Sequence, residues 1–353
     1  MINFALVGCG RIAKRHSELL GFNQISGARL AAVCDLFEEK SKKIGEQFSV
    51  PSYTDMHQMM LNEKVDVVVV LTESGNHAKN VVELAQYGKH VIVEKPMALT
   101  IDDADAMIHA CDSAGVKLFV VKQNRFNVPV LKLREALEQG RFGKLVLGTV
   151  RVRWCRPQAY YDQASWRGTW EMDGGVLTNQ ASHHVDMLEW MMGDVESVFA
   201  HSTTALAKIE AEDTAVVTLK FRNGALGIIE ATTATRPKDL EGSISILGEG
   251  GTVEIAGFAV NLMKTWCFVN ADSGDEEVME KYSVNPPNVY GFGHQAYYEY
   301  VVDCITNNGP HLVDGLVGRR SLELIHAIYE SIETGREVFL RFKPKHCRLG
   351  CKS

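Results

Sequence analysis

The sequence predicts an α/β protein with an N-terminal doubly wound parallel sheet and a C-terminal α+β domain built on a large open-faced sheet, mixed or antiparallel. Three observations predict this class. Short apolar runs alternate with helical patterns up to Val121, a glycine motif follows the first run, and the later sequence shows a period of two. The pattern changes near Asn124, so we expect domains at residues 1–122 and 123–353.

The first domain alternates strands with helices. The strand candidates are apolar, often β-branched runs, as expected for strands buried on both faces: 2–7, 30–34, 65–71, 90–93 and 117–121. The helix candidates have apolar residues every three or four positions: 12–20, 38–48, 78–87 and 102–114. Thr100 and Asp103 form a capping-box pattern before the last helix. Repeated β-α-β units imply right-handed crossovers and a parallel sheet.

The second domain begins with a helix over 130–139 and then becomes rich in strands. Apolar and polar residues alternate over 146–155, which gives one apolar and one polar face. Asn223-Gly224 lies between apolar runs at 215–221 and 225–230, a strong signal for a two-residue hairpin. Two further strands are expected at 243–247 and 252–255.

Composition excludes several classes of function. The 353 residues include 37 Lys and Arg against 44 Asp and Glu, a net charge of −7, which argues against a basic surface for nucleic acid. No apolar run approaches the ~20 residues of a membrane span, and the N-terminus lacks a signal-peptide pattern. The eight cysteines form no Cys-x-x-Cys pair, so we expect reduced thiols in the cytoplasm. No Cys/His cluster has zinc spacing, and we expect no metal.

The segment Gly8-Cys9-Gly10-Arg11-Ile12-Ala13 follows a strand and opens a helix, as the dinucleotide-binding fingerprint of Rossmann domains requires. The glycines permit a tight turn and close approach of a pyrophosphate, which the helix N-terminus also favours. Asp35 ends the second strand, where it can accept hydrogen bonds from a ribose. An acid followed by Leu36 would repel a 2′-phosphate, so we predict NAD rather than NADP. The motif alone also fits FAD, or a tight turn with no ligand.

Two other loops follow strands of the first sheet, where ligands of such sheets bind. One runs from Thr72 to His77, and the other is Glu94-Lys95-Pro96. The candidate cofactor contacts from the glycine motif, the second strand and these loops are Gly8, Gly10, Arg11, Ile12, Asp35, Thr72, Ser74, His77, Glu94 and Lys95, and Gln123 is a further candidate.

A second group of polar residues follows Gly174-Gly175. If this segment is helical, Asn179, His183 and Asp186 lie along one face. His183 could then accept an alcohol proton, with Asp186 orienting its ring and Asn179 contacting the substrate. The competing interpretation is a capped helix with a buried structural histidine.

Arginines and aromatic residues are concentrated between Arg151 and Trp170. The arginines are Arg151, Arg153, Arg156 and Arg167, and the aromatic residues are Trp154, Tyr160, Tyr161, Trp166 and Trp170. Guanidinium groups bind phosphate or carboxylate, and aromatic rings pack on sugars or bases. The cluster therefore fits an anionic substrate, although Arg, Trp and Tyr are enriched at subunit interfaces as well.

In combination, the glycine motif, Glu94-Lys95-Pro96, Gly174-Gly175, His183 and Asp186 resemble the glucose-fructose oxidoreductase/inositol dehydrogenase/rhizopine-catabolism (Gfo/Idh/MocA) family over essentially the whole chain. The resemblance implies an N-terminal Rossmann domain and homodimers or homotetramers built through the C-terminal sheet. It also implies hydride transfer between a sugar-like alcohol and NAD(P), with Lys95 and His183 as catalytic residues.

Five segments are similar to one bacterial branch of that family, the UDP-N-acetyl-D-glucosaminuronate 3-dehydrogenases of lipopolysaccharide O-antigen biosynthesis. These segments are 119–125, 156–162, 166–168, 179–183 and 290–294. The branch oxidises the C3 hydroxyl of a UDP-sugar, and some members reoxidise bound NADH with 2-oxoglutarate. The similarity implies substrate contacts from Lys95, Arg156, Tyr160, Tyr161, Arg167, Asn179 and His183.

One departure leaves the proton acceptor open. Many family members have Asp where this chain has Asn179, which cannot support an imidazolium by charge. Either His183 or Lys95 could accept the hydroxyl proton. Two other functions also stay open: a dehydrogenase of a free sugar or inositol, and a non-catalytic NAD-sensing member of the family. The presence of both Lys95 and His183 argues against the second.

Overall fold

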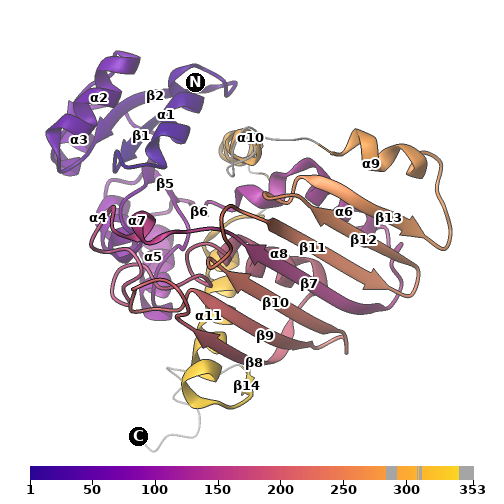
Figure 1. The fold of residues 1–353 in the computed structure, drawn as a ribbon. Coiled ribbons are helices and arrows are strands. Elements are labelled where there is room, and N and C mark those ends of the chain that lie inside the picture. Colours follow the sequence, from indigo (N-terminus) through magenta and orange to yellow (C-terminus); the bar gives the residue numbers. More distant parts are fainter. Residues whose placement is uncertain (284–291, 308, 310–311, 342–353) are drawn as a thin grey trace, which may run out of the picture.

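The first part of the chain forms a six-stranded, wholly parallel sheet in the computed structural model, which describes residues 1–283, 292–307, 309 and 312–341 (Figure 1). Its strand order is β3-β2-β1-β4-β5-β6, so the order reverses between β1 and β4. The strands are β1 (Ile2–Val7), β2 (Ala28–Cys34), β3 (Ser52–Tyr53), β4 (Val67–Val70), β5 (His90–Val93) and β6 (Leu118–Val120). A ligand is expected outside the carboxyl ends of the strands at this reversal.

The connections between these strands are mostly helical. They are α1 (Ala13–Gly21), α2 (Glu38–Phe48), α3 (Met56–Asn62), η1 (Ser74–Asn76), α4 (His77–Ala85) and α5 (Ile101–Ser113). The Thr100 hydroxyl accepts a hydrogen bond from the Asp103 amide, which confirms the predicted cap of α5. The short elements β3 and α3 were not predicted. The strand β3 has only two residues and therefore no periodicity to detect.

The helix α10 (Gly293–Asn307) belongs to the second half of the sequence but packs against the first sheet. Its Tyr297 and Tyr298 are fully buried, and the Tyr298 ring lies 5.5 Å from that of Phe4 in β1. Figure 1 shows α10 lying between the two sheets. Residues 290 and 291 of the segment 290–294 lie outside the described part.

The second sheet has eight strands in the order β13-β12-β11-β7-β10-β9-β8-β14. Its strands are β7 (Leu145–Arg153), β8 (Val195–Thr203), β9 (Thr214–Phe221), β10 (Leu226–Thr232), β11 (Glu241–Gly248), β12 (Gly251–Ala256), β13 (Leu262–Phe268) and β14 (Val338–Phe339). Only the pair β7 and β10 among these is parallel, so the sheet is mixed. The predicted hairpin at Asn223-Gly224 joins β9 to β10, with Gly224 at φ +87°.

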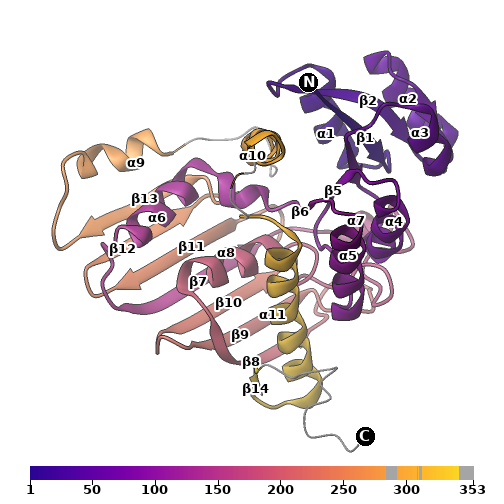
Figure 2. The same ribbon diagram turned by 180° about the vertical axis from the view of Figure 1, so that it is seen from behind.

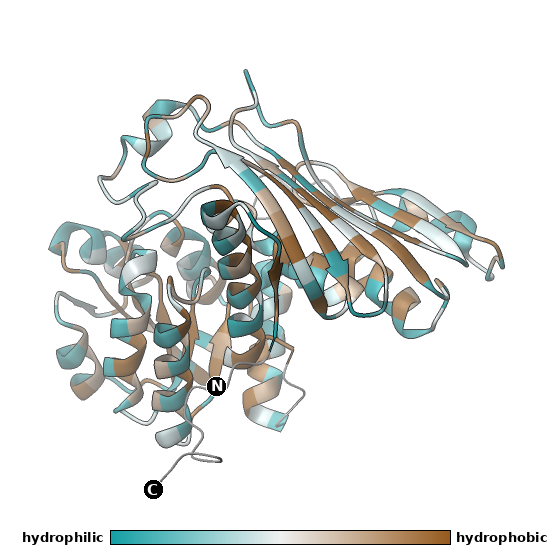
Figure 3. Ribbon diagram, turned by 90° about the horizontal axis from the view of Figure 1, so that it is seen from below, coloured by the Kyte–Doolittle hydropathy of each residue, from teal (hydrophilic) through white to brown (hydrophobic). Residues whose placement is uncertain are grey.

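Helices cover one face of this sheet and leave the other open (Figures 2 and 3). The covering helices are α6 (Val128–Glu138), α8 (Ser182–Met192) and α11 (Gly315–Thr334). At Gly148 of β7, an added Cβ would meet Leu188 and Met192 of α8 at less than 3 Å. The predicted open-faced sheet is confirmed. Among the described helices, none is long and apolar enough to cross a membrane.

The remaining short elements lie in the connections: η2 (Gln123–Phe126), α7 (Gln158–Tyr161), η3 (Asp275–Glu277) and α9 (Val278–Lys281). Two of them, η2 and α7, bring predicted site residues toward the first sheet.

Candidate active site

A cleft of about 740 Å³ lies at the carboxyl ends of the first sheet's strands, facing the segments that follow β7. All predicted cofactor contacts line it: Gly8, Gly10, Arg11, Ile12, Asp35, Thr72, Ser74, His77, Glu94, Lys95 and Gln123. Of the predicted substrate contacts, Lys95, Tyr160, Arg167 and Asn179 line it, whereas Arg156, Tyr161 and His183 do not. The cleft thus brings the two parts of the chain together around Lys95.

The glycine turn after β1 has the shape that a dinucleotide needs. Gly8 has φ +98°, and an added Cβ would lie 2.7 Å from the carbonyl carbon of Leu71. An added Cβ at Gly10 would meet no protein atom within 4 Å, so that position faces open space. Asp35 accepts the Cys9 amide at 2.7 Å, which ties the end of β2 to the turn. The turn therefore leaves room for a pyrophosphate at the N-terminus of α1.

Glu94, at the end of β5, is the centre of a buried polar network. One carboxylate oxygen lies 3.0 Å from His16 Nε2, and the other accepts the Lys95 amide at 2.9 Å. His16 Nδ1 lies 2.6 Å from the Tyr298 hydroxyl, so α10 helps to fix this network. Although burial opposes it, hydrogen bonds from His16 and His294 hold the pKa of Glu94 well below its usual range. His16, Glu94 and His294 are close enough to hold a metal ion, and in this structure His16 Nε2 lies within hydrogen-bonding distance of the Glu94 carboxylate itself.

Lys95 extends from this network into the cleft. Its ammonium nitrogen donates to the main-chain carbonyl of Asn179 at 2.7 Å. Burial lowers the pKa of Lys95, while the carboxylates of Glu94 and Asp173 act in the opposite direction. A lysine in this environment can lose its proton more easily than an exposed one. Nearby, the His77 ring lies 2.8 Å from the carbonyl of Pro96 and 3.0 Å from that of Thr72, which holds the two loops together.

His183 lies at the start of α8, with its Nε2 2.9 Å from the side-chain nitrogen of Gln123. Burial and the neighbouring Lys95 hold the pKa of His183 well below its usual range, so the ring is neutral near pH 7. The prediction that Asp186 orients this ring is wrong. Asp186 instead pairs with Lys122 at 3.0 Å and with Arg125 at 2.7 Å. Those two cations flank Gln123 in the chain, so Asp186 supports the histidine only indirectly.

Asn179 also differs from expectation. The helix α8 begins at Ser182, so Asn179 lies in the preceding turn and not on a helix face shared with His183. Its side-chain amide donates to Asp173, a residue that sequence reasoning missed. Asp173 is 1% exposed and also accepts the Gly168 amide at 2.8 Å. An acid directly before Gly174-Gly175 was the available signal, but nothing local shows that its side chain turns inward.

A second buried carboxylate, that of Glu212, packs against the double glycine Gly174-Gly175. Glu212 accepts the Leu177 amide at 2.9 Å and the Tyr329 hydroxyl at 3.1 Å. An added Cβ at Gly175 would lie 2.1 Å from the Glu212 carboxylate, so only glycine fits there. Burial raises the pKa of Glu212 to about 7. Glu212 and Tyr329 thus determine the path of the chain into Asn179.

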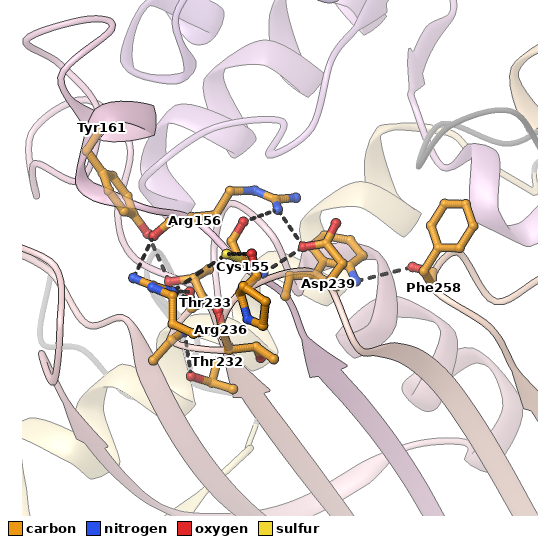
Figure 4. A network of polar contacts seen from close by, with 12 residues as sticks. Cys155, Arg156, Tyr161, Thr232, Thr233, Arg236, Asp239 and Phe258 are labelled. Atoms are coloured by element: carbon orange, nitrogen blue, oxygen red, sulfur yellow. Dashed lines mark hydrogen bonds and ion pairs between the residues drawn. The ribbon is translucent and has the colours of Figure 1, made fainter.

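Three of the four arginines between Arg151 and Trp170 pair with carboxylates, and Arg167 is the fourth. Arg151 and Arg153 lie on the open face of the sheet, where they pair with Glu230 and Glu241. Figure 4 shows Arg156 turned toward Asp239, which it contacts at 3.0 Å, within a polar network that includes Cys155, Thr233 and Arg236. The Tyr161 hydroxyl, also in this network, lies 2.9 Å from Thr233.

Arg167 is held by aromatic rings instead of a carboxylate. Its guanidinium lies 4.6 Å from the ring centres of both Tyr160 and Trp166. One terminal nitrogen donates to the Tyr160 hydroxyl at 2.8 Å, and Nε is buried without a hydrogen-bond partner. Arg167 lines the cleft with Lys95 and has no carboxylate partner among the described ion pairs, so its terminal nitrogens can meet an anion there.

Both halves of the chain match models of one oxidoreductase family. Residues 2–122 match the model "Oxidoreductase family, NAD-binding Rossmann fold", and residues 134–340 match "Oxidoreductase family, C-terminal alpha/beta domain". A myo-inositol 2-dehydrogenase from Thermotoga maritima is 30% identical over 96% of this chain and 98% of its own.

Two solved structures are similar at 43% identity. The WlbA dehydrogenase from Bordetella pertussis, in complex with NADH and UDP-GlcNAcA, has a TM-score of 0.89 over 97% of this chain and 99% of its own. The WlbA dehydrogenase from Chromobacterium violaceum, with the same two ligands, has a TM-score of 0.90 over 97% of each chain.

Proposed function

The chain belongs to the Gfo/Idh/MocA oxidoreductase family, and we propose that it oxidises the C3 hydroxyl of UDP-N-acetyl-D-glucosaminuronic acid. It is an NAD-dependent sugar dehydrogenase acting on a CH–OH group. The nucleotide sugar comes from the two WlbA structures with UDP-GlcNAcA, and C3 comes from the resemblance to one branch of the family. In O-antigen biosynthesis, the 3-keto product would go to an aminotransferase.

The observation that carries this proposal is Arg167. It lines the cleft with Lys95, and its guanidinium has two aromatic rings as neighbours and no carboxylate partner among the described ion pairs. A diphosphate or a uronate carboxylate would complete this site, whereas a neutral inositol would leave the guanidinium unpaired. We also propose substrate contacts from Arg156 and Tyr161, because the Arg156 guanidinium and the Tyr161 ring lie 5.5 Å and 5.1 Å from the ring of Tyr160, which lines the cleft.

The proposed chemistry divides between cofactor and chain. Bound NAD would supply the hydride acceptor for C3, and Gly8 and Gly10 would hold its pyrophosphate and Asp35 its ribose. Lys95 accepts the proton of the 3-hydroxyl, because burial favours its neutral form. The His183 ring is neutral near pH 7 and its Nε2 accepts a hydrogen bond from the Gln123 side chain, so we assign it the role of fixing Gln123 at the edge of the cleft beside the hydroxyl.

The test compares substrates on the purified protein. We expect NADH formation with UDP-N-acetylglucosaminuronic acid and a 3-keto product by mass spectrometry, and loss of NADH when 2-oxoglutarate is added. NADH formation with myo-inositol or free sugars alone would overturn the nucleotide-sugar proposal. It would favour the free-polyol alternative, which the similarity to myo-inositol 2-dehydrogenase supports. Cofactor binding without any turnover would favour a sensor.

We also propose that the open sheet face joins subunits into a homodimer or homotetramer. Val216, Leu226 and Ile228 expose 50%, 56% and 37% of their surface there, beside the ion pairs of Arg151 and Arg153. Light scattering should give a mass of two or four chains, and a monomer would contradict this. The six described cysteines are all free thiols, which supports our placing the reaction in the cytoplasm.

A further inference from the structure

Asp173 is a buried acid that the proposed chemistry leaves without a role. Its two carboxylate oxygens accept hydrogen bonds from the Gly168 amide and the Asn179 side chain. Burial raises the pKa of Asp173, and those two hydrogen bonds together with Arg167 and Lys95 oppose the rise. Keeping a carboxylate in such a place costs free energy unless nearby positive charge compensates it.

Asn179 connects this carboxylate to the reacting amine. Its side chain donates to Asp173, while its main-chain carbonyl accepts the Lys95 ammonium at 2.7 Å. A single residue therefore bonds to both groups. Glu212 fixes the turn that carries Asn179 by accepting a hydrogen bond from the Leu177 amide. Because Asp173 has two hydrogen bonds of its own, its charge is held at a fixed place relative to Lys95.

We propose that Asp173 is the counterion of Lys95 and that, through Asn179, it sets both the position and the charge state of the Lys95 amine. Asp173 is thus a positioning residue, and its role in turnover rests on the proposed function. The carboxylate stabilises the ammonium form of Lys95. It therefore opposes the effect of burial, which favours the neutral amine. Removing the negative charge should shift the equilibrium toward the neutral amine.

Other charges also surround Lys95, and the test must hold them constant. Glu94 precedes it in the chain and stabilises the ammonium, two arginines on the segments after β7 destabilise it, and the ring at the start of α8 is close enough to be influenced by Lys95. These groups are Glu94, Asp173, Arg156, Arg167 and His183.

The experiment measures the ionisation of Lys95 directly, without substrate. The rate of acetylation of Lys95 by acetic anhydride is followed by peptide mass spectrometry across pH in the full chain. We expect Asp173→Asn to lower the midpoint of this profile by on the order of one pH unit. The matched control is Glu171→Gln, which removes the same charge from an exposed position two residues away and should leave the midpoint unchanged.

A charge swap keeps the test valid if Asp173→Asn fails to fold. The double variant Asp173→Asn with Asn179→Asp retains one carboxylate and one amide in the pair, so its midpoint should equal or exceed that of the wild type. A fall below the wild type in the swap, no shift in Asp173→Asn, or an equal shift in Glu171→Gln would overturn the inference. Turnover of UDP-N-acetylglucosaminuronic acid is measured separately. If the wild type lacks it, the proposed function fails while the labelling still decides the role of Asp173.

Discussion

Replacing Arg167 with Met should weaken binding of the nucleotide sugar and leave the cofactor site intact. The guanidinium lines the cleft and has no carboxylate partner among the described ion pairs, so a bound anion would gain at least one charge-assisted hydrogen bond from its terminal nitrogens. Such a bond contributes about 1.5–3 kcal/mol, and each 1.4 kcal/mol is tenfold, so kcat/KM should fall roughly 10- to 140-fold. Most of that loss should be in KM, since the contact is made in the ground state as well as the transition state.

The assay is initial-rate kinetics of NADH formation with two substrates, UDP-N-acetylglucosaminuronic acid and UDP-N-acetylglucosamine, which lacks the carboxylate. If Arg167 binds the carboxylate, the variant should lose much less with the second substrate. If it binds the diphosphate, the losses should match. Arg167→Lys should be intermediate, because lysine keeps the charge without the planar fork. An unchanged KM for both substrates, with NADH affinity retained, would refute the assignment of Arg167 as the anion site.

Three other predictions follow from the same structure. Lys95→Met should reduce kcat by roughly 10²–10⁴-fold and abolish the acidic limb of the pH–rate profile, because the neutral amine that forms as pH rises is the proton acceptor; a larger loss in His183→Ala would instead make the histidine the base. Gly8→Ala should cost about 1–3 kcal/mol of stability and weaken NADH binding, because Gly8 has φ +98° and an added Cβ would collide with the Leu71 carbonyl. Calorimetry checks the stability, and fluorescence titration checks the NADH affinity. Glu212 has its pKa raised from 4.5 to about 7, so the folded state holds that proton more tightly than the unfolded chain. The wild type should therefore lose about 3 kcal/mol of stability as pH rises from 4.5 through 7, and Glu212→Gln should not; equal pH dependence in urea melts of both proteins would contradict this.

The cofactor half was predictable because its determinants are local. The runs at 2–7 and 90–93 coincide with β1 and β5, since strands buried on both faces must be continuously apolar. Ligands of such sheets meet the strand ends, so Asp35 and Lys95 could be placed from the sequence alone. The position of α10 against the first sheet could not, because its contacts are with residues some 290 positions earlier, as in the pair Phe4 and Tyr298.

The substrate half was less predictable because it depends on which charges become paired. Sequence reasoning treated the four arginines as one cluster, but strand register places Arg151 and Arg153 opposite Glu230 and Glu241. The same reasoning paired His183 with Asp186 by helical spacing. The fold instead pairs Asp186 with Lys122, just before η2, and with Arg125 in η2, because those side chains are buried and have no other carboxylate partner among the described ion pairs.

The pairing of arginines with carboxylates explains how a protein with a net charge of −7 can bind an anion beside a lysine that must lose a proton. Three arginines are compensated by carboxylates outside the cleft, which leaves Arg167 to meet the substrate's charge. An anion near Lys95 would by itself favour the ammonium and suppress proton transfer. Arg167 offsets that effect, since its own charge acts on Lys95 in the opposite direction. With nucleotide sugar bound at saturation, the labelling midpoint of Lys95 should therefore be lower in the wild type than in Arg167→Met, and equal midpoints would contradict this compensation.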